Sequence, residues 1–363
     1  MLVRRIDLTD FRIYRHADIA FSPGVTAILG ANAQGKTSLA EAMAWLATAE
    51  SFRGAADDAL VREGADSAYV RAWVTHDDGR EILVEAEINR TGRNRVQINK
   101  QRLARVRDLL GVMRTTVFSP GDLDIVHEGP AVRRKLLDDA LVALNPADDG
   151  LRRDYERILR QRNTLLRQCM GRLGGSAATT LDVWDEQLVA VGSRIGDLRA
   201  ELVADLVGHV RRSYADLAAA EAPLEVIYDP PWRSSGLAAA VAEARNEDVR
   251  RSVTTVGPHR DDVVLMLKSM PARTHASQGE CRTLALALRL AVHRLVTERV
   301  GSAPLLVLDD VLSELDPTRA AALLAHMPSG QVIITSASPL PPEARPDTIM
   351  RVSAGAVVSA EPT

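Results

Sequence analysis

Aromatic residues and cysteines are scarce in this chain of 363 residues. Phe, Tyr and Trp make up only 4% of it, so aliphatic side chains must form the core, and platforms that stack nucleic-acid bases are not expected. The two cysteines, Cys169 and Cys281, lie far apart in the sequence. This usage excludes a disulfide framework and is typical of a reducing compartment.

Long apolar runs and a strong net charge are also missing. No run approaches the length that spans a bilayer, and the first residues lack the apolar core of a signal peptide. We therefore expect a cytoplasmic protein that does not enter a membrane. The net charge of −3 does not mark a nucleic-acid binder, so any basic surface must be local. The length is sufficient for two lobes.

One glycine-rich stretch carries the strongest chemical signal. It follows an apolar run at 25–29 that predicts a strand, and it precedes apolar residues spaced as in a helix. It fits the pattern G-x-x-x-x-G-K-[ST] and consists of Gly30, Ala31, Asn32, Ala33, Gln34, Gly35, Lys36 and Thr37. Its glycines let backbone N–H groups face phosphates, while Lys36 reaches the β- and γ-phosphates and Thr37 ligates Mg²⁺. The alternative is a chance glycine turn before a helix.

Two carboxylates follow a second buried strand, predicted at 305–308. Asp309 occupies the place in which a strand-end carboxylate meets Mg²⁺, usually through water. Asp310 comes next and can polarise the water that attacks the γ-phosphate. The alternative for Asp310 is a solvated turn residue.

A helix beginning near Ser277 has two readings. Ser277 and Glu280 are three residues apart and form a capping box, which explains them without any ligand. A capped helix N-terminus is also an anion site. Because Lys36 serves the phosphates of its own chain, this second N-terminus is most useful against a nucleotide that another copy holds.

The pattern along the chain predicts an α/β protein with an inserted helical part. Alternating residues at 69–74 and 82–88 flank Asp77-Asp78-Gly79 and predict an antiparallel flap beside a nucleotide-binding sheet. Helical apolar spacing then dominates to about residue 247. Stripes at 155–170 and 184–202, separated by a turn at 171–180, predict a helical hairpin. A strand at 332–335 and an Asp316 cap before Pro317 indicate that the sheet resumes.

The order of these motifs resembles ABC-type ATPase heads, and the chromosome-maintenance (SMC-like) branch in particular. Further segments are similar to the RecF family over essentially the whole chain. They are Phe118–Leu123, Arg133–Asp138, Gly257–Asp262, Ala276–Gly279 and Leu308–Asp316. The resemblance implies an ABC-type P-loop head, a mixed sheet with an antiparallel flap, formed by residues 1–120 and 251–363. An inserted helical-hairpin arm would span residues 121–250.

The resemblance also implies roles for single residues. Gly30–Thr37 would bind ATP, Thr37 and Asp309 would hold Mg²⁺, and Asp310 would be the catalytic carboxylate. A signature segment acting on the other subunit would consist of Ser277, Gln278, Gly279 and Glu280, and a D-loop at the interface would contain Ser313 and Asp316. Thr335 stands where transporters place a switch histidine, which fits slow hydrolysis. The family usually has histidine at Phe52 and often glutamine at Glu280.

Two basic clusters are candidates for DNA contacts. The first spans residues 90–107 without an acid between its ends, and the second lies at 152–167. Similarity to an arginine loop of SMC-like heads adds one more residue, and the predicted contacts are Arg53, Arg93, Arg95, Lys100, Arg102 and Arg105. Phosphate neutralisation would give sequence-independent affinity. The alternative is a solvated basic face.

The family's function is therefore expected here. RecF proteins are bacterial ATPases that bind DNA at gaps, form dimers with ATP, and help load the RecA recombinase with RecO and RecR. We expect a weak, DNA-stimulated ATPase whose ATP-driven dimer clamps double-stranded or gapped DNA and is reset by hydrolysis. The main alternative is the nucleotide-binding subunit of a transporter. A GTPase is a poorer alternative because Asn99-Lys100 does not continue as N-K-x-D.

Overall fold

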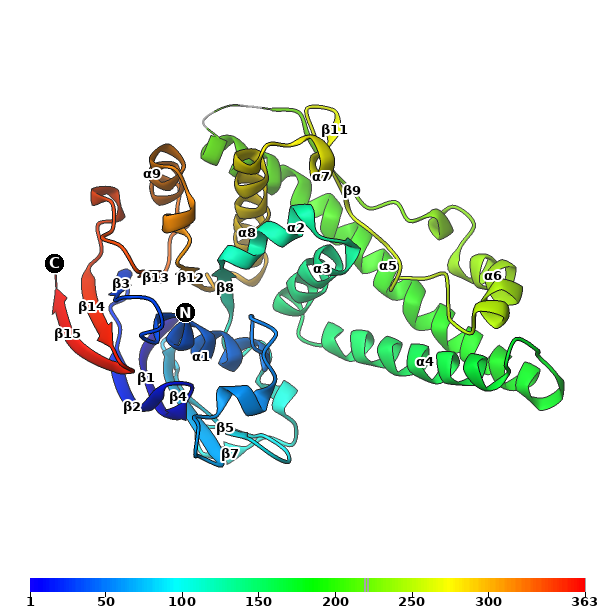
Figure 1. The fold of residues 1–363 in the computed structure, drawn as a ribbon, viewed down its shortest axis with the longest axis horizontal. Coiled ribbons are helices and arrows are strands. Elements are labelled where there is room, and N and C mark those ends of the chain that lie inside the picture. The colour runs from blue at the N-terminus through cyan, green and yellow to red at the C-terminus, as the bar shows by residue number, and fades with distance from the viewer. Residues whose placement is uncertain (219, 221, 363) are drawn as a thin grey trace. The chain divides into compact units, whose positions relative to one another are not determined.

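The computed structural model describes residues 1–218, 220 and 222–362. The chain divides into two compact units (Figure 1). We call residues 1–123, 212–221 and 282–363 the head unit, and residues 124–211 and 222–281 the arm unit. In the described part of the chain, no helix is long and apolar enough to cross a membrane.

The central sheet of the head unit is mostly parallel. Its six strands have the order β15-β14-β3-β13-β12-β8, and only β15 is antiparallel to its neighbour. The strands are β3 (Val25–Leu29), β8 (Thr115–Phe118), β12 (Leu305–Asp309), β13 (Val332–Ser336), β14 (Thr348–Ser353) and β15 (Ala356–Pro362). β12 and β13 are buried throughout, as expected for apolar strands covered on both faces. The carboxyl ends of β3, β12 and β13 therefore meet at one edge.

A second sheet of the head unit is the expected antiparallel flap. Its order is β2-β1-β4-β5-β6-β7. The strands are β1 (Leu2–Phe11), β2 (Tyr14–Ala20), β4 (Ser67–Thr75), β5 (Glu81–Asn89), β6 (Arg95–Ile98) and β7 (Gln101–Arg102). The alternating residues Val70, Ala72 and Val74 point into the core, which confirms the predicted hairpin. The mixed α/β fold with a flap is thus confirmed.

In the described part of the chain, three helices and residues 212–218 of α5 (Gly175–Ala218) complete the head unit, together with short 3-10 turns. α1 (Lys36–Thr48) is almost wholly buried and packs between the two sheets in one hydrophobic cluster. The others are α8 (Gln278–Val300, from residue 282 onward) and α9 (Pro317–Ala325). The 3-10 turns are η1 (Asp57–Leu60), η2 (Val106–Leu109), η3 (Pro120–Leu123), η5 (Leu312–Glu314) and η6 (Pro342–Ala344).

The arm unit is mainly helical, as the sequence predicts. Its helices are α2 (Asp124–His127), α3 (Pro130–Leu144), α4 (Asp148–Gln168), α5 (Gly175–Ala218, of which 175–211 lie here), α6 (Leu237–Arg251) and α7 (Ala272–His275), with the 3-10 turn η4 (Pro231–Arg233). α4 and α5 run side by side (Figure 1). Tyr155 and Ile158 of α4 share a core with Leu188 and Ile195 of α5, which confirms the helical hairpin.

Several details of the arm differ from the prediction. α5 begins at Gly175, so only 171–174 of the expected turn at 171–180 is non-helical, and Met170 is 87% exposed instead of in the apolar stripe. A small sheet of β9 (Leu224–Ile227), β10 (Val264–Leu267) and β11 (Met270–Pro271) was not expected. Because β9 pairs with β10, residues 252–281 group with the arm, whereas we expected the head to resume at 251.

A buried histidine should make the stability of the head unit sensitive to acid. His293 of α8 is 1% exposed, contacts Thr116 Oγ1 through Nδ1 at 3.0 Å, and has its pKa lowered to about 4, chiefly by burial. Since the unfolded chain binds this proton near pH 6.5, the free energy of unfolding should fall by about 3 kcal/mol between pH 6.5 and pH 4. Urea unfolding of wild type and His293→Gln across this range measures it. Equal slopes against pH for both proteins would contradict the prediction.

Candidate nucleotide-binding site

The glycine-rich loop connects β3 to α1 at the edge where the parallel strands end. Gly35 has φ of +112°, and a Cβ there would lie 2.8 Å from the Tyr14 hydroxyl oxygen. A Cβ on Gly30 would lie 2.3 Å from the carbonyl oxygen of Val352. Both positions therefore require glycine, one for its backbone angle and both for space. The Tyr14 hydroxyl donates to the Gly35 carbonyl at 3.0 Å and fixes the loop from the flap.

The hairpin of β14 and β15 also holds this loop, which the sequence analysis missed. The amide of Ala354 donates to Gln34 Oε1 at 2.6 Å. The amide of Gly355 donates to the Gln34 carbonyl at 3.1 Å. No local sequence signal could have joined residues more than 300 positions apart. The loop is thus fixed on both sides before any ligand binds.

Lys36 lies over its own loop. Its Nζ donates to the carbonyls of Gly30 at 2.7 Å and Ala31 at 2.9 Å, and the residue is 5% exposed. An ammonium group has three donor hydrogens, so one more acceptor can be bound without breaking these contacts. A phosphate oxygen at the loop is the acceptor that this arrangement suits.

Asp309 ends β12 beside Thr37, the first turn of α1. Thr37 Oγ1 donates to Asp309 Oδ1 at 3.0 Å, and Thr335 Oγ1 donates to the same oxygen at 2.7 Å. Asp309 is 3% exposed, and burial raises the pKa of its carboxyl although both hydroxyl groups act in the opposite direction. A cation beside this carboxylate would offset that burial.

The oxygens of Thr37 and Asp309 fit a Mg²⁺ ion that a nucleotide brings. Magnesium is usually bound by one or two protein oxygens, with water and phosphate supplying the rest. In the part of the chain that the structure describes, no group of three or more His, Cys, Asp or Glu could hold a metal by itself. Such a site would therefore depend on the phosphates of the nucleotide.

Asp310 is held just beyond the strand end by Thr335 of β13. The register of the two strands sets Thr335 opposite Asp309, and the Thr335 hydroxyl accepts from the Asp310 amide at 3.0 Å while donating to Asp309. Asp310 has φ of +54°, and its carbonyl accepts from Ser313 Oγ at 2.7 Å. One buried hydroxyl thus contacts two neighbouring acidic residues, and the Asp310 amide also donates to the Thr335 carbonyl at 3.1 Å.

Arg53 lies within electrostatic reach of this constellation. Its charge acts to lower the pKa of Asp309, against the larger effect of burial. The Arg53 amide donates to Ser51 Oγ at 3.1 Å, and the Ser51 hydroxyl donates to the buried Glu41, which Arg12 also binds at 2.7 Å. The arginine loop is therefore anchored to α1. Phe52 is half-buried and packs on the core beside it.

The predicted signature residues begin α8, within the arm unit, and form the expected capping box. The Ser277 amide donates to Glu280 Oε2 at 2.8 Å, and the Glu280 amide donates to Ser277 Oγ at 3.3 Å. Lys268 binds Glu280 Oε1 at 2.7 Å. This ion pair, together with the hydrogen bonds from Ser277, lowers the pKa of Glu280 to about 2. Ser277 and Gln278 are exposed, whereas Gly279 and Glu280 are half-buried. Glu280 thus faces its own backbone and Lys268.

The predicted D-loop lies in the head unit between β12 and α9. Ser313 and Asp316 are both exposed. Asp316 caps α9 by accepting from the Arg319 amide at 3.1 Å, and Pro317 is the first helical residue, which confirms the predicted helix start. Arg282 holds the loop by donating to the Glu314 carbonyl at 2.6 Å. The exposed face of this loop remains accessible to a partner.

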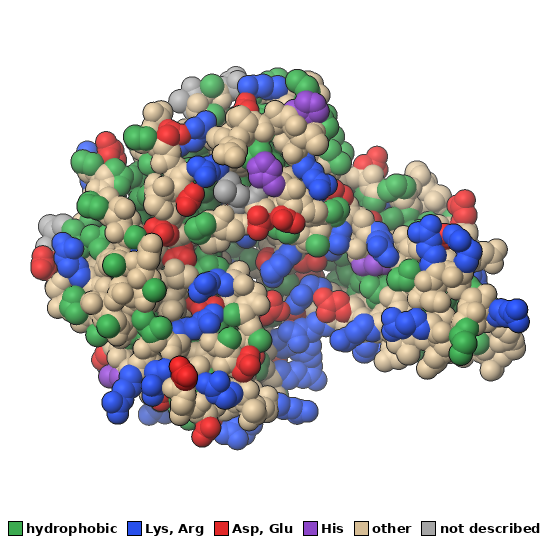
Figure 2. Space-filling view, in the orientation of Figure 1, with side chains coloured by type: hydrophobic (Ala, Val, Ile, Leu, Met, Phe, Trp, Pro, Cys, Tyr) green, Lys and Arg blue, Asp and Glu red, His purple; other side chains and the backbone are tan. Residues whose placement is uncertain are grey.

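Of the predicted DNA contacts, those on the flap are exposed. They are Arg93, Arg95, Lys100, Arg102 and Arg105. Figure 2 shows Lys and Arg side chains gathered over this end of the head unit. Two members of the wider clusters serve the fold instead. Arg90 donates to carbonyls of Ala65 and Arg62, and Arg162 is fully buried against Asp185 and Asp248. Sequence alone does not show which arginines are buried.

Comparison with known proteins identifies the chain. The family model for the RecF/RecN/SMC N terminal domain matches residues 2–354. The DNA replication and repair protein RecF of Streptomyces avermitilis is 43% identical over 352 residues, which cover 93% of this chain and 94% of that protein. RecF of Cutibacterium acnes is 38% identical over 365 residues, covering 93% and 92%.

Solved structures agree with this result. A structure of the recombination mediator protein RecF with ATPγS, in the RecFOR pathway, superposes with a TM-score of 0.90 at 30% identity, covering 98% of this chain and 97% of that one. The Smc head domain of Pyrococcus furiosus shares the fold alone, with a TM-score of 0.60 at 16% identity over 99% and 96%. The fold, the P-loop and the carboxylate at the end of β12 together place the chain in the class of SMC-like P-loop ATPase heads. The chain belongs to the RecF family of DNA replication and repair proteins.

Proposed function

We propose that this protein is an ATP-gated DNA clamp of recombinational repair. Two copies would enclose two ATP molecules, each site combining Lys36, Asp309 and Asp310 of one copy with Ser277 of the other. The observation that carries this proposal is the arrangement of Asp309, Asp310 and Thr335 at the carboxyl ends of β12 and β13, beside Thr37 in the first turn of α1. The relative solved with ATP supports the choice of nucleotide.

The chemistry follows from the contacts in this site. Lys36 would add a phosphate oxygen to its two carbonyl contacts and stabilise the closed loop. Mg²⁺, bound through Thr37 and Asp309, would neutralise charge on the β- and γ-phosphates. Asp310 would accept the proton of the attacking water, and the Ser277 helix N-terminus would stabilise the γ-phosphate charge. Loss of that phosphate removes what both copies share, so the dimer opens.

DNA binding would rely on charge rather than on base reading. The exposed flap residues can approach phosphates of any sequence, and affinity should fall steeply with salt. Arg53 would act at the nucleotide instead, since its charge acts on Asp309. Measuring binding to duplex, single-stranded and gapped DNA with and without ATP, across a salt series, tests this assignment. Binding that is unaffected by salt and ATP would refute it.

Family membership supports a proposal for the partners and for the place in the cell. We propose that the clamp acts in the cytoplasm with RecO and RecR and helps to load RecA at gaps during repair, replication and the SOS response. The words RecFOR pathway belong to the solved relative and support this proposal. The relatives and solved structures described above are RecF and SMC proteins, and they lend no support to the transporter alternative.

Sedimentation velocity tests the proposed clamp. Wild type with Mg²⁺ and a non-hydrolysable ATP analogue should sediment as a dimer, and without nucleotide it should shift toward monomer. Ser277→Ala should bind ATP with about wild-type affinity yet dimerise at least about tenfold more weakly, because a shared contact is missing. A matched control is Ser269→Ala, an exposed serine of the nearby β10–β11 turn. A Ser277→Ala dimer as strong as wild type would argue against the shared site.

Thr335→Val tests how the acidic pair is positioned. Valine keeps the shape but removes the hydroxyl that donates to Asp309 and accepts from Asp310. We expect kcat for ATP hydrolysis to fall about tenfold, because Asp309 and Asp310 each lose one of the contacts that position them, while ATP affinity changes less. Thr335→Ser should restore most of the rate. Steady-state ATPase assays measure kcat, and nucleotide titrations measure ATP affinity. An unchanged kcat in Thr335→Val would show that Thr335 does not position the acidic pair for hydrolysis.

A further inference from the structure

The end of the arm unit where α4 leads into α5 contains a methionine that the fold does not bury. Met170 is 87% exposed, more than any other large hydrophobic residue in the described part of the chain. It also has φ of +48°, which asparagine or glycine adopts at lower cost after a helix. Neither packing nor backbone conformation therefore explains a methionine at this position.

The turn that carries Met170 is nevertheless anchored to the arm. Leu165 and Leu173 lie on either side of it in the sequence and pack against a small core between α4, α5 and α6. The Arg172 amide donates to the Cys169 carbonyl at 2.9 Å. A turn held in this way loses little conformational freedom on binding.

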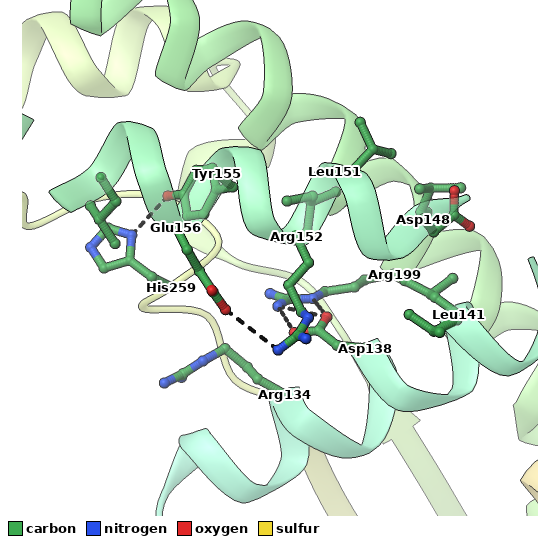
Figure 3. Close-up of a pocket in the computed structure, with 14 residues that line it drawn as sticks. Arg134, Asp138, Leu141, Asp148, Leu151, Arg152, Tyr155, Glu156, Arg199 and His259 are labelled. Atoms are coloured by element: carbon green, nitrogen blue, oxygen red, sulfur yellow. Dashed lines mark hydrogen bonds and ion pairs between the residues drawn. The ribbon is translucent and has the colours of Figure 1, made fainter. Parts of the chain in front are cut away.

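The arginines of α4 divide into two groups. Four of them pair with a carboxylate, and they are Arg152, Arg153, Arg157 and Arg162. Figure 3 shows one of these pairs, in which Arg152 lies 3.5 Å from Glu156. The charge of these four arginines is therefore balanced within the arm itself.

The other two arginines of α4, and one in the turn that follows, are exposed and lack a carboxylate partner among the described residues. In the described structure the guanidinium groups of Arg160 and Arg172 make no hydrogen bond or ion pair, and that of Arg167 contacts only Thr164 Oγ1 at 3.2 Å. The N-terminus of α5 at Gly175 adds a partial positive charge. Three cations on this part of the arm are thus available to bind anions.

Acidic residues do not cancel this positive charge. None occurs at 157–181, and the next one, Asp182, is bound by Arg245 of α6 at 2.5 Å. Glu247 of α6 is bound by both arginines of the last turn of that helix, and Glu243 lies about one turn before it. Figure 2 shows several Lys and Arg side chains at this end of the arm unit. An anion is therefore the ligand that this surface suits.

We propose that this end of the arm is a second DNA contact, in which Arg160, Arg167 and Arg172 bind phosphates and Met170 stacks against a base pair. Such a contact presupposes the proposed DNA clamp and adds a further surface to it. A base stack between two phosphate strands is the complement of an apolar side chain that projects among cations. An acidic peptide satisfies the arginines alone, since a short chain has no slot that encloses a projecting side chain.

The end of a gap is the place where this contact costs least. Insertion between paired bases requires that they unstack. At a gap the terminal base pair has one free face, so no stack has to be opened. The thioether of methionine is polarisable and contacts aromatic rings favourably. The contact therefore distinguishes DNA with an open stack from continuous duplex without reading its sequence.

Methionine methyl NMR of the full chain tests the base contact. The chain has eight methionines, and the Met170 signal is the one that Met170→Leu removes. The probe is a duplex with a single-stranded gap, added at low salt without nucleotide so that no ATP-driven dimer is required. The Met170 methyl signal should move upfield, because a base shields nuclei that lie over its plane. Heparin, a polyanion without bases, should bind the arginines without this upfield shift, and Met270, an exposed methionine of β11, should not shift with either ligand.

Affinity measurements separate the two kinds of contact. Met170→Ala should weaken binding to gapped DNA about tenfold, and binding to continuous duplex much less, because stacking is lost. Arg167→Ala should weaken binding to both DNAs about tenfold and reduce the salt slope by about one. The matched control Arg194→Ala removes an exposed arginine of α5 whose charge acts on Asp148, the first residue of α4, and it should bind as wild type does.

The outcomes separate this contact from the proposed function. A Met170 methyl signal that does not move upfield at saturating gapped DNA would overturn the base contact, and wild-type affinity in Arg167→Ala would overturn the phosphate contact. If Arg102→Ala in the flap lowers DNA affinity while the arm variants do not, the proposed clamp stands and the arm contact is wrong. If the wild-type chain binds neither DNA, the proposed function itself is wrong.

Discussion

Lys36→Ala is expected to lose ATP affinity by at least about 100-fold and to remain monomeric with ATP. The ammonium is held between the Gly30 and Ala31 carbonyls, so its position at the phosphates is set in advance. Charge-assisted contacts to two phosphates contribute on the order of 3 kcal/mol, and no other lysine lies on the loop. Alanine removes both contacts and leaves the loop's backbone donors in place.

Nucleotide titration and sedimentation velocity measure this effect. Lys135→Ala, an exposed lysine of α3, is the matched control and should bind ATP as wild type does. Thermal unfolding of Lys36→Ala without nucleotide should resemble wild type, which shows that the loss is not one of folding. If Lys36→Ala still forms a dimer with ATP, binding of the γ-phosphate by Lys36 is not required for dimerisation, and the prediction is wrong.

Asp310→Asn should lower kcat for ATP hydrolysis by about 100- to 10,000-fold while leaving ATP binding in place. The amide has the same shape but cannot accept the proton of the attacking water. The backbone of residue 310 is held by two contacts, from its amide to the Thr335 hydroxyl and from the Ser313 hydroxyl to its carbonyl. Neither contact involves the carboxylate, so both remain in the variant. Because hydrolysis resets the clamp, the variant's dimer with ATP should also live longer than that of wild type.

Single-turnover hydrolysis and dimer lifetime in the presence of ATP measure the two consequences. Glu343→Gln, at an exposed acid of η6 away from this loop, serves as the control and should hydrolyse ATP normally. If Asp310→Asn has the kcat of wild type, Asp310 is not the catalytic carboxylate, and the alternative of a solvated turn residue is favoured.

Local patterns predicted the parts of the site that lie within single segments. The loop of Gly30–Thr37 is flanked by a strand and a helix, and Asp309 directly follows an apolar strand, so both could be recognised. The cap of Ser277 and Glu280 is likewise local. Their roles in catalysis and across a dimer stay predictions.

Contacts between distant segments could not be predicted. The pairing of Gln34 with Ala354 depends on the strand order that places β14 beside β3. The double contact of Thr335 depends on the register between β12 and β13. The family resemblance places Thr335 where transporters have a switch histidine. It could not show that the Thr335 hydroxyl contacts both Asp309 and Asp310.

The arm shows a similar limit. Apolar spacing located its long helices, because burial of one helix face repeats along the sequence. It missed the pairing of β9 with β10, since strands of four residues leave too little pattern to distinguish them from loops. Charge runs also overstated the basic surface, because Arg162 is a buried member of an ion-pair network rather than an exposed one.

The central claim is that each ATP is completed by residues of two copies, and mixing two inactive variants tests it most directly. Lys36→Ala keeps an intact Ser277, and Ser277→Ala keeps an intact P-loop. One mixed dimer therefore contains one complete site. The account predicts that the mixture hydrolyses ATP faster than the sum of the two variants measured separately. A rate equal to that sum would contradict it.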